Sequence, residues 1–155
     1  MNATDLVVYR GKGFSIALPS DWQLLEGFAG AEAVFASPGS GEDDEFRTTL
    51  NVVREPAPRG KGIDELVSGS VGALHQLLTN FQLLDRQAVR FDQDGLEGER
   101  LLFAYRQGVY VLTAEQWYAT ADDALWTVTA TADSDSFDDW ADLLRQCLRS
   151  FATSS

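Results

Sequence analysis

The strongest constraint on the fold is a segment near the N-terminus with the sequence GFSIALPSDW. Phe14, Ile16 and Leu18 alternate with small or polar residues, which is the two-residue period of a half-buried β-strand. Pro19 has no backbone N–H to donate, so we expect it to end the strand. A Ser-Asp pair then favours a turn, and Trp22 supplies a large apolar side chain just after it. The segment therefore predicts a strand with one buried face, a turn and an aromatic anchor.

The length of the chain sets the number of domains. A chain of 155 residues is long enough to bury a sizeable core and suits one domain. No linker or repeat divides it, so we expect a single domain over residues 1–155 with its core between about 6 and 151. The last residues, Ala152–Ser155, are expected to fray.

The charge balance excludes two classes of partner. The chain has 24 acidic and 12 basic residues, a formal net charge of −12, and no basic run. Nucleic acids and anionic membrane surfaces both need a Lys/Arg footprint. We therefore expect no nucleic acid binding and no direct membrane insertion, and the charge favours a soluble protein or one with a basic partner.

The termini and the cysteine content bear on location. Residues 1–5 lack the basic and apolar regions of a secretory signal, and no apolar run is long enough to span a membrane. The single cysteine, Cys147, rules out an internal disulfide. These features predict a cytoplasmic protein, or a cell-envelope protein if a leader has been removed.

Hydrophobic periodicity along the chain predicts strands and two helices. The expected strands are Leu6–Tyr9, Phe14–Leu18, Ala33–Ser37, Thr48–Arg54, Phe81–Phe91, Leu96–Tyr105, Val109–Thr120 and Leu125–Ala132. One amphipathic helix is expected over Ile63–Leu78, and a second begins at Ser136, which pairs with Asp139 in a capping pattern. Short turns imply antiparallel pairing, and the helices must cover sheet faces. The fold class is therefore α+β: an antiparallel sheet of about six to eight strands flanked by two main helices, as an α/β/α-type sandwich.

The order of several motifs resembles the PsbP-like superfamily, which includes the DcrB and LpqN families and the Mog-type proteins. The motifs that carry the resemblance are GFSIALPSDW, Thr49–Pro56, Leu96–Arg100, Glu115–Tyr118, Trp126–Thr131 and Leu148–Phe151. The resemblance implies an antiparallel sheet flanked by helices, no shared enzymatic activity, and no catalytic, metal or cofactor residues. It also implies a binding subunit, accessory protein or chaperone. Some DcrB-like members are adaptors for effectors of bacterial type VI secretion, and LpqN-like members are typically actinobacterial lipoproteins.

The residues themselves also give little support for an enzyme. The only histidine, His75, lies at the edge of a helical apolar stripe, and Cys147 is interpreted as a small, semi-buried core residue. Arg145 and Arg149 are near Cys147 in the sequence, but residues two apart do not face each other on a helix, so no set of nucleophile, base and orienting group is visible. A small acidic hydrolase that uses a carboxylate pair is kept as an alternative, because 24 acids offer many pairs.

No metal motif is complete. Asp133–Ser136 resembles the start of a calcium loop, but Asp138 stands where glycine is needed and Leu144 where glutamate is needed. Asp135 and Ser136 are better explained as helix caps. The acidic run Glu42–Glu45 is interpreted as a solvated loop. We expect neither a metal nor a cofactor.

What remains is a binding surface on one strand. The two-residue period places Tyr110, Gln116 and Tyr118 on one face and Trp117 on the other. Tyrosine and tryptophan beside polar neighbours are typical interface anchors, so these four residues are the candidates for partner contact. The competing interpretation is that Trp117 and Trp126 belong to the core.

The function predicted from the sequence is a non-catalytic protein-binding or accessory domain. The specific hypothesis is a bacterial chaperone or adaptor linked to secretion or to the envelope. Its partner would be a secreted or basic protein, and a homodimer through a sheet face is also open. The alternatives are the carboxylate-pair hydrolase and a structural, lipoprotein-type subunit of the cell envelope.

Overall fold

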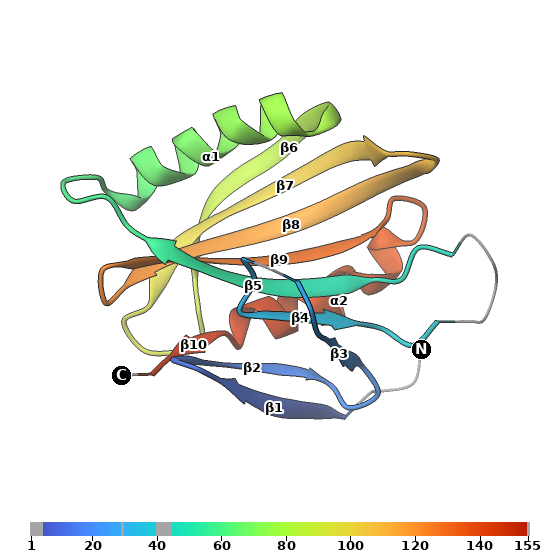
Figure 1. Cartoon of the computed structure of the whole chain (residues 1–155), viewed down its shortest axis with the longest axis horizontal. Helices are drawn as coiled ribbons and strands as arrows, with labels where there is room; N and C mark the ends of the chain where they lie inside the picture. The colour runs from blue at the N-terminus through green and yellow to red at the C-terminus, as the bar shows by residue number, and fades with distance from the viewer. Residues whose placement is uncertain (1–4, 29, 40–44, 155) are drawn as a thin grey trace.

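The computed structural model describes residues 5–28, 30–39 and 45–154. Within these ranges the secondary-structure elements form three layers (Figure 1). In chain order they are β1 (Leu6–Gly11), β2 (Phe14–Pro19), β3 (Gln23–Leu25), β4 (Ala33–Ala36), β5 (Thr49–Pro56), α1 (Ile63–Leu77), β6 (Thr79–Arg90), β7 (Glu97–Gln107), β8 (Tyr110–Ala121), β9 (Ala124–Asp133), α2 (Phe137–Arg149) and β10 (Ala152–Thr153).

The middle layer is a sheet in the order β3-β4-β5-β9-β8-β7-β6, in which all neighbours are antiparallel. Helix α1 covers one face, and α2 lies with a small sheet, β1-β2-β10, on the other (Figure 1). The predicted α+β class, with an antiparallel sheet flanked by two helices, is confirmed. The seven strands of the main sheet fall within the predicted six to eight, counted over the described residues.

Two short strands, β3 and β10, were not predicted from the sequence. Strand β10 also shows that the prediction of a frayed C-terminus was wrong for Ala152 and Thr153. Ala152 and Thr153 form β10 and pair with β2. The Thr153 backbone N–H donates to the side-chain oxygen of Gln93 at 2.9 Å, and the Ser154 N–H donates to the Gly13 carbonyl at 2.9 Å. These tertiary hydrogen bonds fix the tail. The other unpredicted strand is β3, which pairs with β4.

The predicted capping pair is also corrected. Ser136 does occupy the position before α2, but its side chain makes no capping hydrogen bond. Its hydroxyl donates instead to the Asp133 carbonyl at 3.2 Å, while an Asp133 carboxylate oxygen accepts the Asp135 N–H at 2.9 Å. The loop before the helix is therefore organised by Asp133. Residues 42–44 of the acidic run lie outside the described residues.

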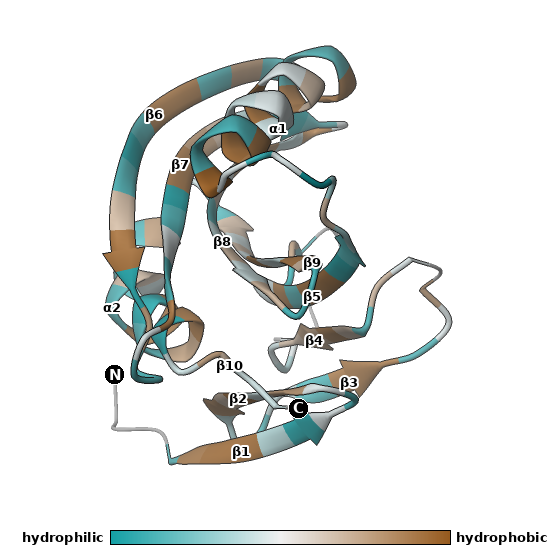
Figure 2. Ribbon diagram, turned by 90° about the vertical axis from the view of Figure 1, so that its left-hand side faces the viewer, coloured by the Kyte–Doolittle hydropathy of each residue, from teal (hydrophilic) through white to brown (hydrophobic). Residues whose placement is uncertain are grey.

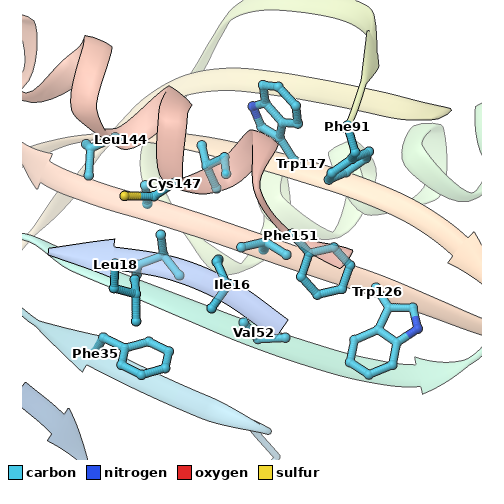
Figure 3. Close-up of a cluster of buried hydrophobic side chains, with 14 of the residues drawn as sticks. Ile16, Leu18, Phe35, Val52, Phe91, Trp117, Trp126, Leu144, Cys147 and Phe151 are labelled. Carbon is cyan, nitrogen blue, oxygen red and sulfur yellow. The ribbon is translucent and has the colours of Figure 1, made fainter. Parts of the chain in front are cut away.

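The main core lies between the large sheet, α2 and the small sheet. The alternating Phe14, Ile16 and Leu18 of β2 are all buried there, as their period predicted. Figure 3 shows Phe151, just after α2, between β2 and Trp126. The Phe151 ring centroid lies 5.4 Å from that of Trp126. Trp126 is therefore a core residue.

The opposite face of the sheet buries far fewer apolar side chains than the main core does. Of the residues of α1, only Val67 is fully buried. It joins a second, smaller apolar cluster, made with Leu101, Phe103, Ala114, Tyr118 and Leu125 of the sheet. Figure 2 shows the sheet curling around α1, with β6 and β7 arching past the helix. Helix α1 thus covers the β6–β8 side of this face better than the β5–β9 side.

The structure gives Gly98, in one of the motifs noted above, a clear physical role. A Cβ atom at Gly98 would lie 1.8 Å from the backbone carbonyl oxygen of Tyr118 on the neighbouring strand. Backbone cannot move aside as a flexible side chain can, so the β7–β8 ladder requires glycine here. We expect Gly98→Ala to lower the free energy of unfolding by about 1–3 kcal/mol, measured by urea denaturation.

Gly69→Ala is the matched control. A Cβ atom at Gly69 on α1 meets nothing within 4 Å. Alanine favours a helix over glycine, so this change should raise the stability by up to about 1 kcal/mol. Equal effects of the two substitutions would contradict the assigned role of Gly98.

Candidate binding cleft

A cleft of about 700 Å³ lies between α1 and the floor of the main sheet. Helix α1 provides an aliphatic wall, and strands β5, β7, β8 and β9 provide the floor. The helical residues that line it are Leu66, Ser70, Ala73, Leu74 and Leu77. Leu77 is 78% exposed, so the apolar wall continues to the surface.

The two-residue period of the floor strands explains why this face is semi-polar. In β9, Trp126, Val128 and Ala130 are buried in the main core, while the threonines between them line the cleft. In β5, Val52 is likewise in the core and Asn51 lines the cleft. The same strands therefore give one face large apolar side chains and the other face hydroxyl and amide groups.

A chain of hydrogen bonds crosses the floor and reaches the helix. The Thr129 hydroxyl donates to Oε1 of Gln116 at 2.8 Å, and Nε2 of Gln116 donates to the Tyr118 hydroxyl. The Tyr118 hydroxyl lies 2.5 Å from Oγ of Ser70. Because the Tyr118 oxygen already accepts from Gln116, its own proton can be donated to Ser70. This chain links β9, β8 and α1.

Burial keeps the phenols of the cleft protonated. Desolvation raises the pKa of Tyr118, and the Ser70 and Gln116 hydrogen bonds oppose this effect only in part. Burial also raises the pKa of Tyr105. Both groups therefore stay neutral hydrogen-bonding groups at physiological pH, and they do not act as bases.

The structure separates the four residues predicted to contact a partner. Gln116 and Tyr118 lie side by side on the cleft floor. Trp117 faces the main core, where it is 4% exposed and contacts Phe91 edge to face at 5.2 Å. Tyr110 does not line the cleft, and its ring packs 5.5 Å from that of Phe46. Partner contact by these residues stays a prediction.

Several cleft residues were not found by the sequence analysis. Ser70 of α1 and the threonines of β9, Thr127, Thr129 and Thr131, line the cleft but are not among the predicted site residues. The signal that could have found the threonines is their strict alternation with Trp126, Val128 and Ala130. That alternation marks one face of β9 as partly polar.

The candidate nucleophile and base do not meet. His75 is exposed on α1, and its ring contacts Phe81 at 4.5 Å. Cys147 is fully buried in the main core, where desolvation raises the pKa of its thiol to about 12. A thiol with so high a pKa is a poor nucleophile, because the thiolate is the reactive form.

We expect Cys147 to be protected in the folded protein. A thiol-reactive dye should label it only as fast as the core opens, whereas urea-unfolded chain should react at once. Absorbance of the released dye measures both rates. Equal rates for folded and unfolded protein would show that the core around Cys147 is open.

Of the acidic residues that the structure describes, Glu99 and Glu115 are buried, and both are held in ion pairs outside the cleft lining. Glu115 accepts from Arg100 at 3.2 Å, from Arg145 at 2.9 Å and from the Trp117 indole at 2.8 Å. Glu99 accepts from Arg86 at 2.9 Å. Among the described residues, no group of three or more His, Cys, Asp or Glu is placed to hold a metal ion.

Removal of the Glu115 carboxylate should lower the free energy of unfolding substantially. Glu115 is 1% exposed, so Glu115→Ala leaves two arginines and an indole N–H without their shared partner. We expect a loss of about 3–5 kcal/mol in the free energy of unfolding. Glu97→Ala, which breaks the exposed pair with Arg90, is the control and should cost far less. Similar losses would show that the buried network contributes no more than a surface pair.

Comparison with known proteins places this architecture in a family. The sequence model of the DcrB family matches residues 34–150, which include the cleft floor and both helices. The chain belongs to the DcrB family. The predicted PsbP-like, DcrB-type fold is thereby confirmed. No curated protein sequence matches the chain.

Solved structures of the PsbP-like fold superpose over nearly the whole chain. Cyanobacterial PsbP (CyanoP) from Synechocystis sp. PCC 6803 has a TM-score of 0.72 at 19% identity, with 99% of this chain and 95% of that chain covered. LpqN, described as involved in cell envelope biogenesis of Mycobacterium tuberculosis, has a TM-score of 0.69 at 16% identity, with coverages of 99% and 93%. PA94 from Pseudomonas aeruginosa, a protein of unknown function, has a TM-score of 0.69 at 15% identity, with coverages of 97% and 98%.

These likenesses show the fold. In the part of the chain that the structure describes, neither helix is long and apolar enough to cross a membrane.

Proposed function

We propose that this DcrB-family protein is a non-catalytic accessory protein that holds an apolar segment of a protein partner in the α1 cleft. It would act as a chaperone or adaptor for a secreted or envelope protein. The observation that carries the proposal is the cleft itself: an aliphatic helix wall over a hydrogen-bonded polar floor.

The dimensions and chemistry of the cleft support this function. A volume of about 700 Å³ lies within the roughly 300–1,000 Å³ range of ligand sites. An apolar segment would pack against Leu66, Leu74 and Leu77, while its polar groups would meet the hydroxyls of the floor. Occupation would also bury apolar surface of Leu77, which the free chain leaves exposed.

The net charge of the chain supports a basic partner, and the similarity to LpqN supports a role at the cell envelope. The net charge of −12 favours a basic partner. The description of LpqN supports a link to the cell envelope. A structural, lipoprotein-type envelope subunit would share this surface and differ mainly in what it assembles with. A homodimer through the same face would place a second copy on the cleft.

The carboxylate-pair hydrolase is less well supported. A two-carboxylate mechanism needs both acids beside one substrate. Among the described residues that line the cleft, only Glu55 carries a carboxylate.

Site-specific photocrosslinking in the native host tests the proposal. A photoreactive phenylalanine derivative at Leu77, on the cleft lip, should form an adduct with one protein partner. The same group at Val109, an equally exposed aliphatic residue outside the cleft, should not. Mass spectrometry of the adducts identifies the partner and separates it from a second copy of the chain. Equal adducts at both positions, or none at Leu77, would contradict the proposal.

A second variant separates loss of the site from loss of the fold. Gln116→Ala with Tyr118→Ala removes the floor network but also buried side chains. Thr127→Trp instead fills the cleft from a partly exposed position, and Thr120→Trp is its control at an exposed position that does not line it. Thr127→Trp should abolish the Leu77 adduct with little change in unfolding midpoint, and Thr120→Trp should leave it intact.

A further inference from the structure

A second pocket, on the other face of the sheet, is lined by arginines. It has a volume of about 360 Å³ and lies where strands β6, β7 and β8 meet the C-terminal part of α2. Its lining residues are Val89, Arg90, Arg100, Trp117, Arg145 and Arg149. Four of the twelve basic residues of a chain with net charge −12 thus surround one small space.

The buried base of this pocket is rigidly built. Arg100 donates to Asp85 at 2.8 Å and to the buried Glu115 at 3.2 Å. Arg145 donates through Nε to the same Glu115 oxygen at 2.9 Å. These bonds fix the two guanidinium groups, and among the described residues the terminal N–H groups of Arg145 make no hydrogen bond.

The outer arginines have spare donors. Arg149 makes no ion pair with any residue that the structure describes, and it lies one helical turn after Arg145 on the same face of α2. Within the described part of the chain, the one ion pair of Arg90 is with Glu97, at 3.4 Å, and both side chains of that pair are largely exposed. An exposed pair of this kind is weak and leaves Arg90 free to turn to another anion.

The charges in the pocket do not balance. The described carboxylates that pair with its four arginines are those of Asp85, Glu97 and Glu115. One of the four positive charges is therefore left without a described carboxylate partner. A compact anion would supply the missing acceptor oxygens.

We propose that this arginine pocket binds a phosphoryl group. A carboxylate can be satisfied by one bidentate arginine, whereas a phosphate has more acceptor oxygens and a charge that suits several guanidinium groups. Arg90, Arg145 and Arg149 provide these groups from two elements on opposite sides of the space. The site is independent of the α1 cleft, because no residue lines both.

Titration of the full chain with inorganic phosphate, at constant ionic strength set with chloride, tests the proposal. The Trp117 indole N–H bonds to Glu115 beside the pocket, so its NMR cross-peak reports on it. We expect a saturable shift with phosphate and none with chloride alone. Arg149→Gln should weaken phosphate binding about tenfold without loss of stability, because its side chain is exposed and makes no ion pair in the described structure.

Arg106→Gln is the matched control, since it removes the same charge from an exposed position outside the pocket. It should bind phosphate like the unmodified chain. A linear or absent shift with phosphate would overturn the proposal, as would equal affinities of the two variants.

Binding to phospholipid vesicles tests whether the phosphoryl group belongs to a lipid headgroup or to a soluble phosphorylated compound. Cosedimentation with phosphatidylglycerol vesicles that is competed by phosphate and lost in Arg149→Gln would assign the site to a lipid headgroup. Saturable phosphate binding without cosedimentation would assign it to a soluble phosphorylated compound. Vesicle binding that Arg149→Gln leaves unchanged would overturn the assignment to this pocket.

Discussion

The main sheet has two faces to cover, and the chain covers them with unequal amounts of apolar surface. On the α2 side, Leu50, Val52, Trp126 and Val128 of the sheet meet the helix, β2 and the final Phe151 in one continuous core (Figure 3). On the α1 side the only fully buried helical residue is Val67. Burial of apolar surface is the main favourable term in folding, so the α2 side anchors the fold. On the α1 side, part of the sheet and helix surface stays uncovered, and it is available to bind a ligand.

Polar side chains make the weakly covered face stable without closing it. Buried polar groups are costly unless they are hydrogen-bonded, and among the described residues no buried side-chain polar atom lacks a partner. The polar side chains of the floor form hydrogen bonds with one another and with the helix, in the order Thr129, Gln116, Tyr118 and Ser70. These bonds attach α1 to the floor. The face can therefore stay partly wet. That is the physical condition for a cleft with an aliphatic wall and a polar floor.

Local periodicity accounts for the parts of the fold and the site that the sequence predicted. The alternation in β2 and β8 placed Phe14 in the core and put Gln116 and Tyr118 on one face. The two-residue strand β10 carries no such pattern, and it forms because the Gln93 side chain and β2 hold it. The cleft itself depends on how far α1 extends across the sheet. The arginine pocket joins α2 to β6, β7 and β8, which are remote from that helix in sequence, so neither site has a local signature.

The contacts of α1 also determine where a ligand can enter. Arg86 of β6 donates to the Asp64 carboxylate at 2.8 Å and to the Ser68 hydroxyl at 3.0 Å, and Phe81 of β6 packs against His75. The helix is thus held along its β6 side, and further across the floor it is joined by the Ser70–Tyr118 hydrogen bond and by the packing of Val67 in the smaller apolar cluster. The opposite wall of the cleft is β5, through Asn51 and its neighbours. Strand β5 is fixed in its ladder with β9 and belongs to the main core, and among the described residues no side-chain hydrogen bond or ion pair joins it to α1. A bound segment would therefore enter between α1 and β5 and run along the threonines of β9.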